Sequence, residues 1–182
     1  MDRPEPRPTR PWLAAGAELS GILSRVDGPE FDHVLDTFRE PDHRWFVTGQ
    51  GRSGLVASMF AMRLMHLGLQ VHLVGEVTAP AIRNGDWIMI VSGSGSTPVS
   101  LGYAKVAKNE HAHVLSVTSD PRSRLSQLSD CTLTIPVVDS QQLGGSAFEQ
   151  GALLVLDALI LGLARDDPEA KERMARLHTN MQ

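Results

Sequence analysis

Short apolar runs alternate with longer amphipathic stretches along most of the chain. The runs end at glycine or polar turn residues and are largely apolar on both faces, a pattern that predicts strands buried inside a parallel sheet. The predicted strands cover residues 45–48, 71–74, 87–91, 114–117 and 132–138. The count and spacing of these runs predict a sheet of about five strands.

The stretches between the strands carry apolar residues at three- and four-residue spacing, which is typical of helices packed on a sheet. The predicted helices cover residues 12–26, 29–38, 53–67, 98–109, 123–128, 147–164 and 168–177. Strands that alternate with helices predict an α/β fold, a single doubly wound domain in the flavodoxin-like order. In such sheets, ligands bind beyond the carboxyl ends of the strands.

The length of 182 residues suits one domain. We expect residues 1–11, rich in Pro and Arg, to form a flexible arm that is not a secretory signal. Residues 12–182 are expected to form the domain, including the N-terminal helices and the C-terminal helix. No run is expected to be long and apolar enough to span a bilayer.

Composition narrows the classes of partner. The net charge of −4 disfavours nucleic acid, although a local cluster of donors can still bind a small anion. The single cysteine, Cys131, cannot form an internal disulfide, which fits a reducing cytoplasm. Most of the histidines show no paired spacing that suggests a metal: His33, His43, His72, His111 and His113.

A first glycine-rich loop follows the strand at 45–48 and precedes a helix. Gly49-Gln-Gly51-Arg-Ser-Gly54 matches the G-x-G-x-x-G pattern, and Glu76 ends the next strand. By spacing alone this is a dinucleotide fingerprint with Glu76 on a ribose. The alternative is a tight strand-to-helix turn with no ligand. Glycines let the backbone approach an anion at a helix N-terminus, where Arg52 and Ser53 add a cation and a hydroxyl.

A second loop favours a phosphate over a dinucleotide. Ser92-Gly-Ser94-Gly-Ser96-Thr97 lies between the strand at 87–91 and the helix that begins at Pro98. Hydroxyl groups and backbone N–H groups together form an anion nest that suits one terminal phosphate. A simple helix cap is the alternative, but Ser96 or Thr97 alone would satisfy it.

These motifs resemble the 6-phospho-3-hexuloisomerases of the sugar isomerase (SIS) domain superfamily. The resemblance rests on Gly51-Arg-Ser-Gly54, the segment 60–68 (Phe-Ala-Met-Arg-Leu-Met-His-Leu-Gly), Val74-Gly-Glu76, Ser92-Gly-Ser-Gly95 and Phe148-Glu149. It implies conversion of 3-hexulose 6-phosphate to fructose 6-phosphate in the ribulose monophosphate pathway of formaldehyde assimilation. It also implies that the enzyme uses no metal or nucleotide and assembles as a homotetramer.

The resemblance also implies roles for individual residues. The phosphate would lie against Ser53, Ser92, Ser94 and Thr97, and Glu76 would bind sugar hydroxyls or brace a loop. Moving a carbonyl from C3 to C2 passes through an enediolate, which one carboxylate can form and reprotonate.

Glu149, at the start of an apolar helix, is the best candidate for that carboxylate, although the helix dipole also favours a glutamate there. His178 would open the cyclic sugar or shuttle a proton, in its own or a neighbouring subunit's site. A histidine at a helix end is more often only a cation there. His66 is expected to be a packed or interfacial imidazole.

The helix at 147–164 is apolar all round, so more than the sheet must cover it. We therefore expect a homo-oligomer, unless the N-terminal helices supply the cover. The rival functions are a sugar-phosphate-sensing module, an isomerase of another sugar phosphate and a dinucleotide-binding protein, the last disfavoured by the second loop.

Overall fold

The computed structural model describes residues 10–181 and contains one parallel sheet. Its strands are β1 (Arg44–Gly49), β2 (Gln70–Leu73), β3 (Trp87–Val91), β4 (His113–Thr118) and β5 (Cys131–Thr134). They lie in the order β2-β1-β3-β4-β5, and every neighbouring pair is parallel. The predicted doubly wound fold and its flavodoxin-like order are confirmed.

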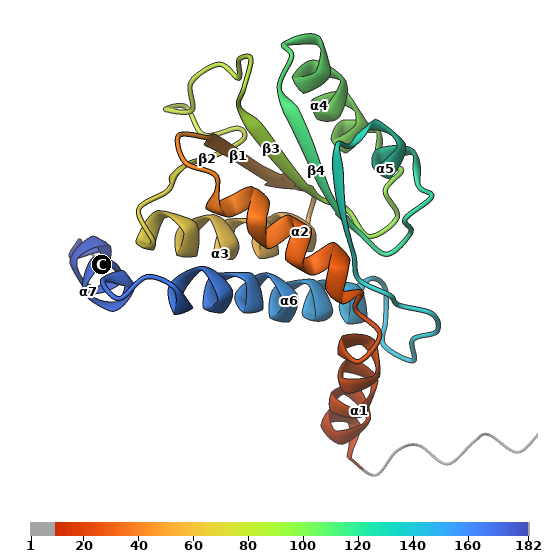
Figure 1. Ribbon diagram of the computed structural model, residues 1–182. Coiled ribbons are helices and arrows are strands. Elements are labelled where there is room, and N and C mark those ends of the chain that lie inside the picture. The colour runs from red at the N-terminus through yellow and green to blue at the C-terminus, as the bar shows by residue number, and fades with distance from the viewer. Residues whose placement is uncertain (1–9, 182) are drawn as a thin grey trace, which may run out of the picture.

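Helices cover both faces of this sheet (Figure 1). The helices α2 (Gly28–Arg39), α3 (Arg52–His66) and α6 (Ser146–Arg165) lie on one face, whereas α4 (Pro98–Asn109) and α5 (Arg124–Leu128) lie on the other. The remaining two lie at opposite ends of α6: α1 (Pro11–Leu23) near its N-terminus and α7 (Ala170–Leu177) near its C-terminus. The predicted arm falls mostly outside the described residues.

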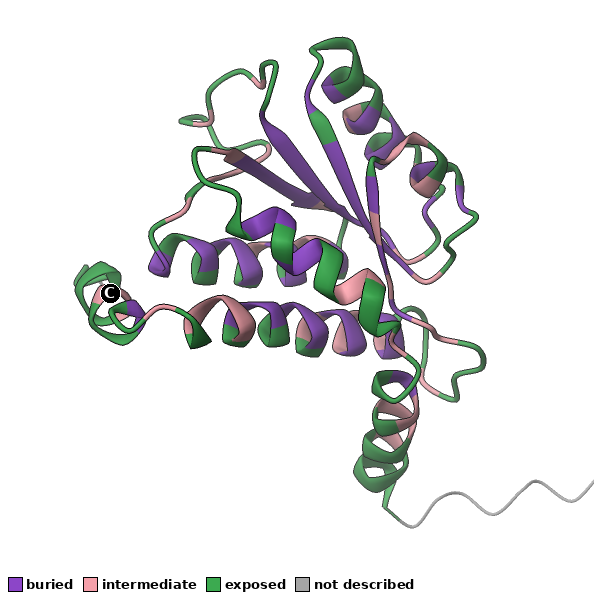
Figure 2. Cartoon of the chain, in the orientation of Figure 1, coloured by how far each residue is buried: buried purple, intermediate pink, exposed green. Residues whose placement is uncertain are grey.

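The core lies between the sheet and its two helical layers. Figure 2 shows the strands as the most continuously buried part of the chain, and all five residues of β3 are buried. On the α2–α3–α6 side, Trp45 stacks on Phe38 with 3.9 Å between ring centroids and on Trp87 at 5.4 Å. This packing holds the strands rigidly, and with them the loops that follow their carboxyl ends.

The main difference in element boundaries lies at β5, which ends at Thr134 rather than at residue 138. Ile135 still donates a backbone hydrogen bond to the carbonyl of Thr118. The next N–H that could reach β4 is that of Val137, but it donates to the carbonyl of Ile135 instead, so the ladder ends there. The chain then leaves the sheet and forms the segment that leads to α6.

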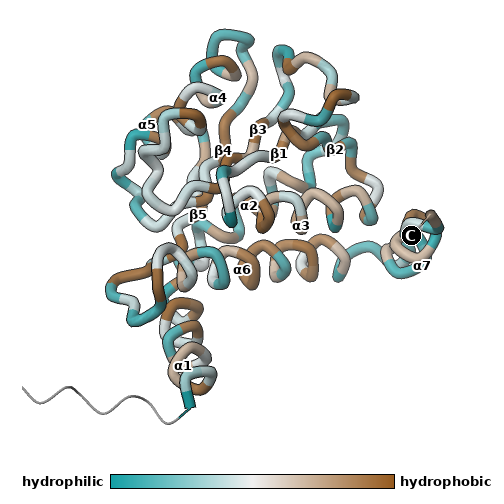
Figure 3. The backbone as a smooth tube through the Cα atoms, turned by 180° about the vertical axis from the view of Figure 1, so that it is seen from behind, coloured by the Kyte–Doolittle hydropathy of each residue, from teal (hydrophilic) through white to brown (hydrophobic). Residues whose placement is uncertain are grey.

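We expected no run to be long and apolar enough to span a bilayer. By length and composition this expectation was wrong. Within residues 10–181, α6 is long and apolar enough to cross a bilayer. Figure 3 shows its apolar residues along most of its length. Its buried residues, however, pack in the same cluster as those of α2, α3 and the sheet, which is how the core helix of a folded domain behaves. The match is therefore weak evidence for a membrane.

Candidate active site

The two glycine-rich loops meet at one edge of the sheet. β1 and β3 are neighbours, and Gly49 at the end of β1 pairs with Val91 at the end of β3. The loops that follow, residues 49–54 and 92–97, therefore leave the same carboxyl edge side by side. Gly51 and Gly95 therefore lie at one edge of the sheet, the edge at which ligands bind in such folds.

The first loop needs its glycines for its own geometry. Gly51 has a φ of +58°, a conformation that other residues rarely adopt. A Cβ atom on Gly49 would lie 2.7 Å from the backbone of Ser53, so any side chain there would displace the start of α3. The tight turn leaves Ser53 buried at the N-terminal end of α3, beside a cavity.

The second loop divides its hydroxyls between two roles. The Ser92 side chain is buried, and its hydroxyl lies 3.4 Å from that of Thr97, so these two groups face one another inside the loop. Ser94 is exposed, and its hydroxyl accepts a hydrogen bond from the Ser96 backbone at 3.3 Å. Of the predicted phosphate ligands in this loop, Ser94 is the one that lines the cavity.

A cavity of about 420 Å³ lies beyond this edge and gathers residues from four parts of the chain. Three predicted site residues line it together: Ser53, Ser94 and Glu149. The rest of its wall comes from Gly93, Ser119, Val137, Ser140, Gly144, Gly145, Ala147 and Phe148. The volume suits a molecule of the size of a sugar phosphate.

Glu149 is held by a cation from a different helix. Its carboxylate accepts a hydrogen bond from the Arg52 guanidinium, which links the N-terminal ends of α3 and α6. The Glu149 side chain is only 12% exposed, whereas that of Arg52 is 63% exposed. A largely enclosed carboxylate beside an exposed cation can transfer protons while the cation stabilises a nearby anion.

The electrostatics of the edge also favour an anion. The helices α3, α4 and α6 each begin at this edge, and the N-terminus of a helix carries a partial positive charge from its free N–H groups. The hydroxyls of Ser53 and Ser94 add neutral donors there. Together these groups can attract an anion next to a carboxylate.

Glu76 and Gly51 lie on the flank of this site and not in its cavity. They line a neighbouring cavity of about 340 Å³ together with Gly49, Gly54 and Ser58. The spacing that suggested a dinucleotide motif therefore does bring Glu76 to the first loop, because β2 lies next to β1.

His178 lies far from Glu149 within one chain. Its ring stacks on that of His66, with 5.3 Å between centroids, at the opposite end of α3 from Arg52. His66 is buried, and its Nδ1 atom has no hydrogen-bond partner among the described residues. Burial lowers the pKa of His66, and the nearby His178 and Arg63 lower it further. The fold of one chain therefore does not bring the two predicted catalytic residues together.

Sequence reasoning missed two hydroxyls of the cavity wall, Ser119 and Ser140. The Ser119 hydroxyl donates to the carbonyl of Gly93 at 2.8 Å, as does the Thr118 hydroxyl at 3.0 Å. Because Ser119 directly follows β4, the rule that ligands bind at carboxyl ends of strands could have found it. Ser140 lies in an irregular segment after β5, and no sequence pattern indicates its place.

No group of three or more His, Cys, Asp and Glu residues within the described part of the chain is arranged to hold a metal ion. The prediction that the protein works without a metal or nucleotide stays a prediction.

Comparison with known families and proteins gives a consistent result. The SIS domain model matches residues 38–161, more than half of the chain. The 3-hexulose-6-phosphate isomerase of Mycobacterium gastri is 39% identical over 174 residues, covering 91% of this chain and 86% of that enzyme. The enzyme of the same name from Bacillus subtilis is 38% identical, with coverage of 91% and 94%.

Solved structures show the same fold. The hypothetical protein MJ1247 from Methanococcus jannaschii matches with a TM-score of 0.85 and 29% identity, over 95% of this chain and 100% of that one. Its crystal structure led to an inferred function of 3-hexulose-6-phosphate isomerase. The predicted family resemblance is confirmed.

Proposed function

The chain belongs to the SIS domain family, close to its 3-hexulose-6-phosphate isomerases, and from that premise we propose that it interconverts 3-hexulose 6-phosphate and fructose 6-phosphate. The observation that carries this proposal is the single cavity that joins two hydroxyl-bearing anion loops to an enclosed carboxylate. A phosphate site next to a base is what the isomerisation of a sugar phosphate requires.

We propose that the phosphate binds at the N-terminal ends of α3 and α4. Ser53 and Ser94 would donate hydrogen bonds to it, and Arg52 would add a positive charge. Ser92 and Thr97 would support the loop from inside, since their hydroxyls face each other. Gly51 would permit the close approach of the backbone, and Glu76 would bind sugar hydroxyls or brace the loop from the neighbouring cavity.

Glu149 is the proposed base. Starting from fructose 6-phosphate, it removes the proton from C3, and the electron pair of that C–H bond forms the C2–C3 double bond of an enediolate. The proton of the C3 hydroxyl passes to the C2 oxygen within the enediolate, the proton held by Glu149 returns to C2, and the carbonyl appears at C3. One carboxylate serves both transfers at carbon, so no external acceptor is needed. The Arg52 guanidinium contacts Glu149 and would stabilise the negative charge of the enediolate.

We further propose that the enzyme is a homo-oligomer, a tetramer by analogy with its family. Three apolar residues form an exposed stripe on α3, Leu55, Met59 and Met62, and α6 exposes Leu154 and Leu161. A second copy packed on these helices through a two-fold axis perpendicular to them would run antiparallel. His178 of that copy would then lie near Glu149 of the first, which is how we propose that His178 takes part.

The remaining proposals concern context. Residues 12–182 are proposed to work as one catalytic domain, although the family model matches only residues 38–161. The proposed setting is the cytoplasm and the ribulose monophosphate pathway, with no nucleic acid or membrane partner. The single cysteine agrees with a reducing compartment: Cys131 is buried, and burial raises the pKa of its thiol to about 11, which keeps it unreactive.

The test is an isomerase assay on the purified protein, with 3-hexulose 6-phosphate generated in situ from ribulose 5-phosphate and formaldehyde. Fructose 6-phosphate should accumulate only when the protein is present. Binding of fructose 6-phosphate without any turnover would instead indicate a sensing module. If the protein turned over only a different sugar phosphate, it would still be an isomerase, but with another substrate.

A further inference from the structure

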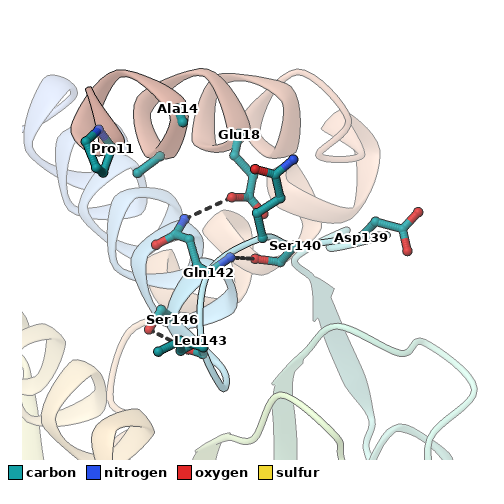
Figure 4. A pocket seen from close by; sticks show the side chains of 10 residues that line it. Pro11, Ala14, Glu18, Asp139, Ser140, Gln142, Leu143 and Ser146 are labelled. Atoms are coloured by element: carbon teal, nitrogen blue, oxygen red, sulfur yellow. Dashed lines mark hydrogen bonds between the residues drawn. The ribbon is translucent and has the colours of Figure 1, made fainter. Parts of the chain in front are cut away.

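A second cavity lies outside the candidate active site, between α1 and the segment 139–146 (Figure 4). Its volume is about 760 Å³, and Glu18 from α1 faces Gln142 across it. The same segment supplies Ser140, Gly144 and Gly145 to the wall of the catalytic cavity. One short stretch of chain therefore separates the two cavities.

This segment has few contacts that fix its position. All residues from 138 to 145 are exposed except Gln142, and the two large apolar side chains, Val138 and Leu143, are 74% and 90% exposed. Apolar packing therefore does not hold the segment. Its internal bonds run only from Gln142 to Ser140 and around the start of α6.

One hydrogen bond ties the segment to a distant part of the fold. The Gln142 amide donates to the Glu18 carboxylate at 3.3 Å. Apart from the bonds at the start of α6, it is the only hydrogen bond within residues 10–181 that joins residues 139–143 to another element. The other Glu18 oxygen is buried without a partner among those residues. Keeping a carboxylate oxygen in that state costs free energy, so the fold retains Glu18 at the expense of stability.

Glu18 lies close to the end of α1 that packs on the core. It lies one turn before Ile22, which is 1% exposed and packs against Gly151 of α6. A Cβ atom on Gly151 would approach the Ile22 side chain to 3.2 Å, so the glycine lets α1 come close to α6. The position of Glu18 is therefore fixed relative to the helix that carries Glu149.

We propose that Glu18 is a positioning residue for the isomerase site. It acts through Gln142, whose bond holds the segment 139–146 in place as a wall of the catalytic cavity. Without that bond, Ser140 and the Gly144–Gly145 pair would leave the cavity wall for part of the time. Substrate binding would then weaken, whereas proton transfer by Glu149, which sits on α6, would change less. This inference rests on the proposed function.

The first experiment needs no activity. Hydrogen–deuterium exchange of the full chain should be compared between the native protein, Glu18→Ala, Glu18→Gln and the control Asp32→Ala, which removes an exposed carboxylate from α2. The amides of Gln142 and Ser146, both hydrogen-bonded inside the segment, report its order. They should exchange about tenfold faster in Glu18→Ala, the effect of losing one hydrogen bond to a charged group. Glu18→Gln keeps an acceptor oxygen and should behave as the native protein, as should Asp32→Ala.

The second experiment measures the isomerase. Glu18→Ala should raise KM about tenfold and lower kcat less than threefold, and Glu18→Gln should restore KM. Gln142→Leu should reproduce Glu18→Ala, and the double variant should be no worse than either single one, since both remove the same bond. Native exchange and KM in Glu18→Ala would overturn the proposal, as would a Glu18→Gln variant as impaired as Glu18→Ala. If the native protein shows no isomerase activity, the proposed function fails, and the exchange result alone decides this inference.

Discussion

The two ends of the paired helices α3 and α6 have different character. At their N-terminal ends, Arg52 and Glu149 form an ion pair beside a cavity that also holds Ser53 and Ser94. At the far end of α3, about 20 Å away along the helix, His66 and His178 stack on each other, and neither ring lines that cavity. Residues of suitable chemistry occur at both ends, but only the N-terminal end places them around this cavity.

This difference between the two helix ends shows that the side chains must also lie at the carboxyl edge of the sheet, where several loops converge. A suitable type of side chain is not enough. The N-terminal end receives loops from β1, β3, β4 and β5, so hydroxyls distant in sequence converge there. The histidine end receives the short helix α7 instead. If that end takes part in catalysis, a second copy of the chain must bring it to an active site.

The largest effect is expected at Glu149. Glu149→Gln keeps the shape of the side chain and removes its basicity, so kcat should fall by about 10²–10⁴ while binding of fructose 6-phosphate changes only a few-fold. Exchange of the C3 proton of fructose 6-phosphate with deuterated solvent should disappear in parallel, as NMR can measure. Near-normal turnover in a folded variant would show that Glu149 is not the base. His66 or Glu76 would then be tested next.

A smaller effect is expected at the phosphate loop. Ser94→Ala should raise KM because a hydrogen bond to a charged phosphate contributes roughly 1.5–3 kcal/mol, which is about ten- to a hundredfold. Ser92→Ala is the matched control, since the Ser92 hydroxyl faces Thr97 inside the loop. It should affect thermal stability more than KM. Equal KM values for Ser94→Ala and the native protein would remove Ser94 from the phosphate site.

The histidine end should respond more weakly and in a different way. His178→Ala should slow turnover of the ring-closed sugar about tenfold while leaving more of the proton exchange on the open-chain form. Mixing His178→Ala with Glu149→Gln gives a sharper test, because hybrid oligomers would contain some sites with both native residues. Recovery of activity on mixing would support action across subunits. No recovery, with subunit exchange shown by mass spectrometry, would count against it.

The smallest effect concerns pH and stability at His66. Its pKa is lowered in the folded protein, so the unfolded chain binds a proton more readily. The contribution of neutral His66 is therefore fully present above the unfolded pKa of about 6.5 and is lost as pH falls through the lower, folded pKa. Two groups face the ring, His178 and Arg63, and both are cationic when protonated. His66→Gln should flatten the dependence of Tm on pH below about 6.5, where the folded and unfolded states differ in protonation; an unchanged slope would exclude His66 as its cause.

Much of the fold follows from local sequence pattern. The strands 87–91 and 114–117 are apolar on both faces because the sheet is covered on both sides, and runs this short and this apolar are typical of buried parallel strands. The end of α3 was also predicted correctly: Gly68, which follows the predicted helix 53–67, has a φ of +90° in the structure. The error at the end of β5 arose because the apolar pattern continues through Val137 and Val138, although the N–H of Val137 donates to Ile135 and not to β4.

The candidate site was predictable only in part. Ser53 and Ser94 follow strands in recognisable loops, and Glu149 follows a glycine-rich turn, so their residue types and positions indicated them. Whether a hydroxyl points into the cavity or back into its own loop was not predictable, as the contrast between Ser94 and Ser92 shows. That choice depends on loop dihedral angles and on neighbours such as Thr97 and Ser96.

The sequence by itself determined the order of strands and helices, the family and the two anion loops, because these depend on periodicity and on residues close together in the chain. Tertiary structure alone decided three further matters: the pairing of Arg52 with Glu149, the distance between Glu149 and His178, and the contact of Glu18 with Gln142. The first and the third join residues about a hundred positions apart. The second depends on where the ends of the helices lie in space. Such contacts arise from how helices pack on the sheet, which no local pattern records.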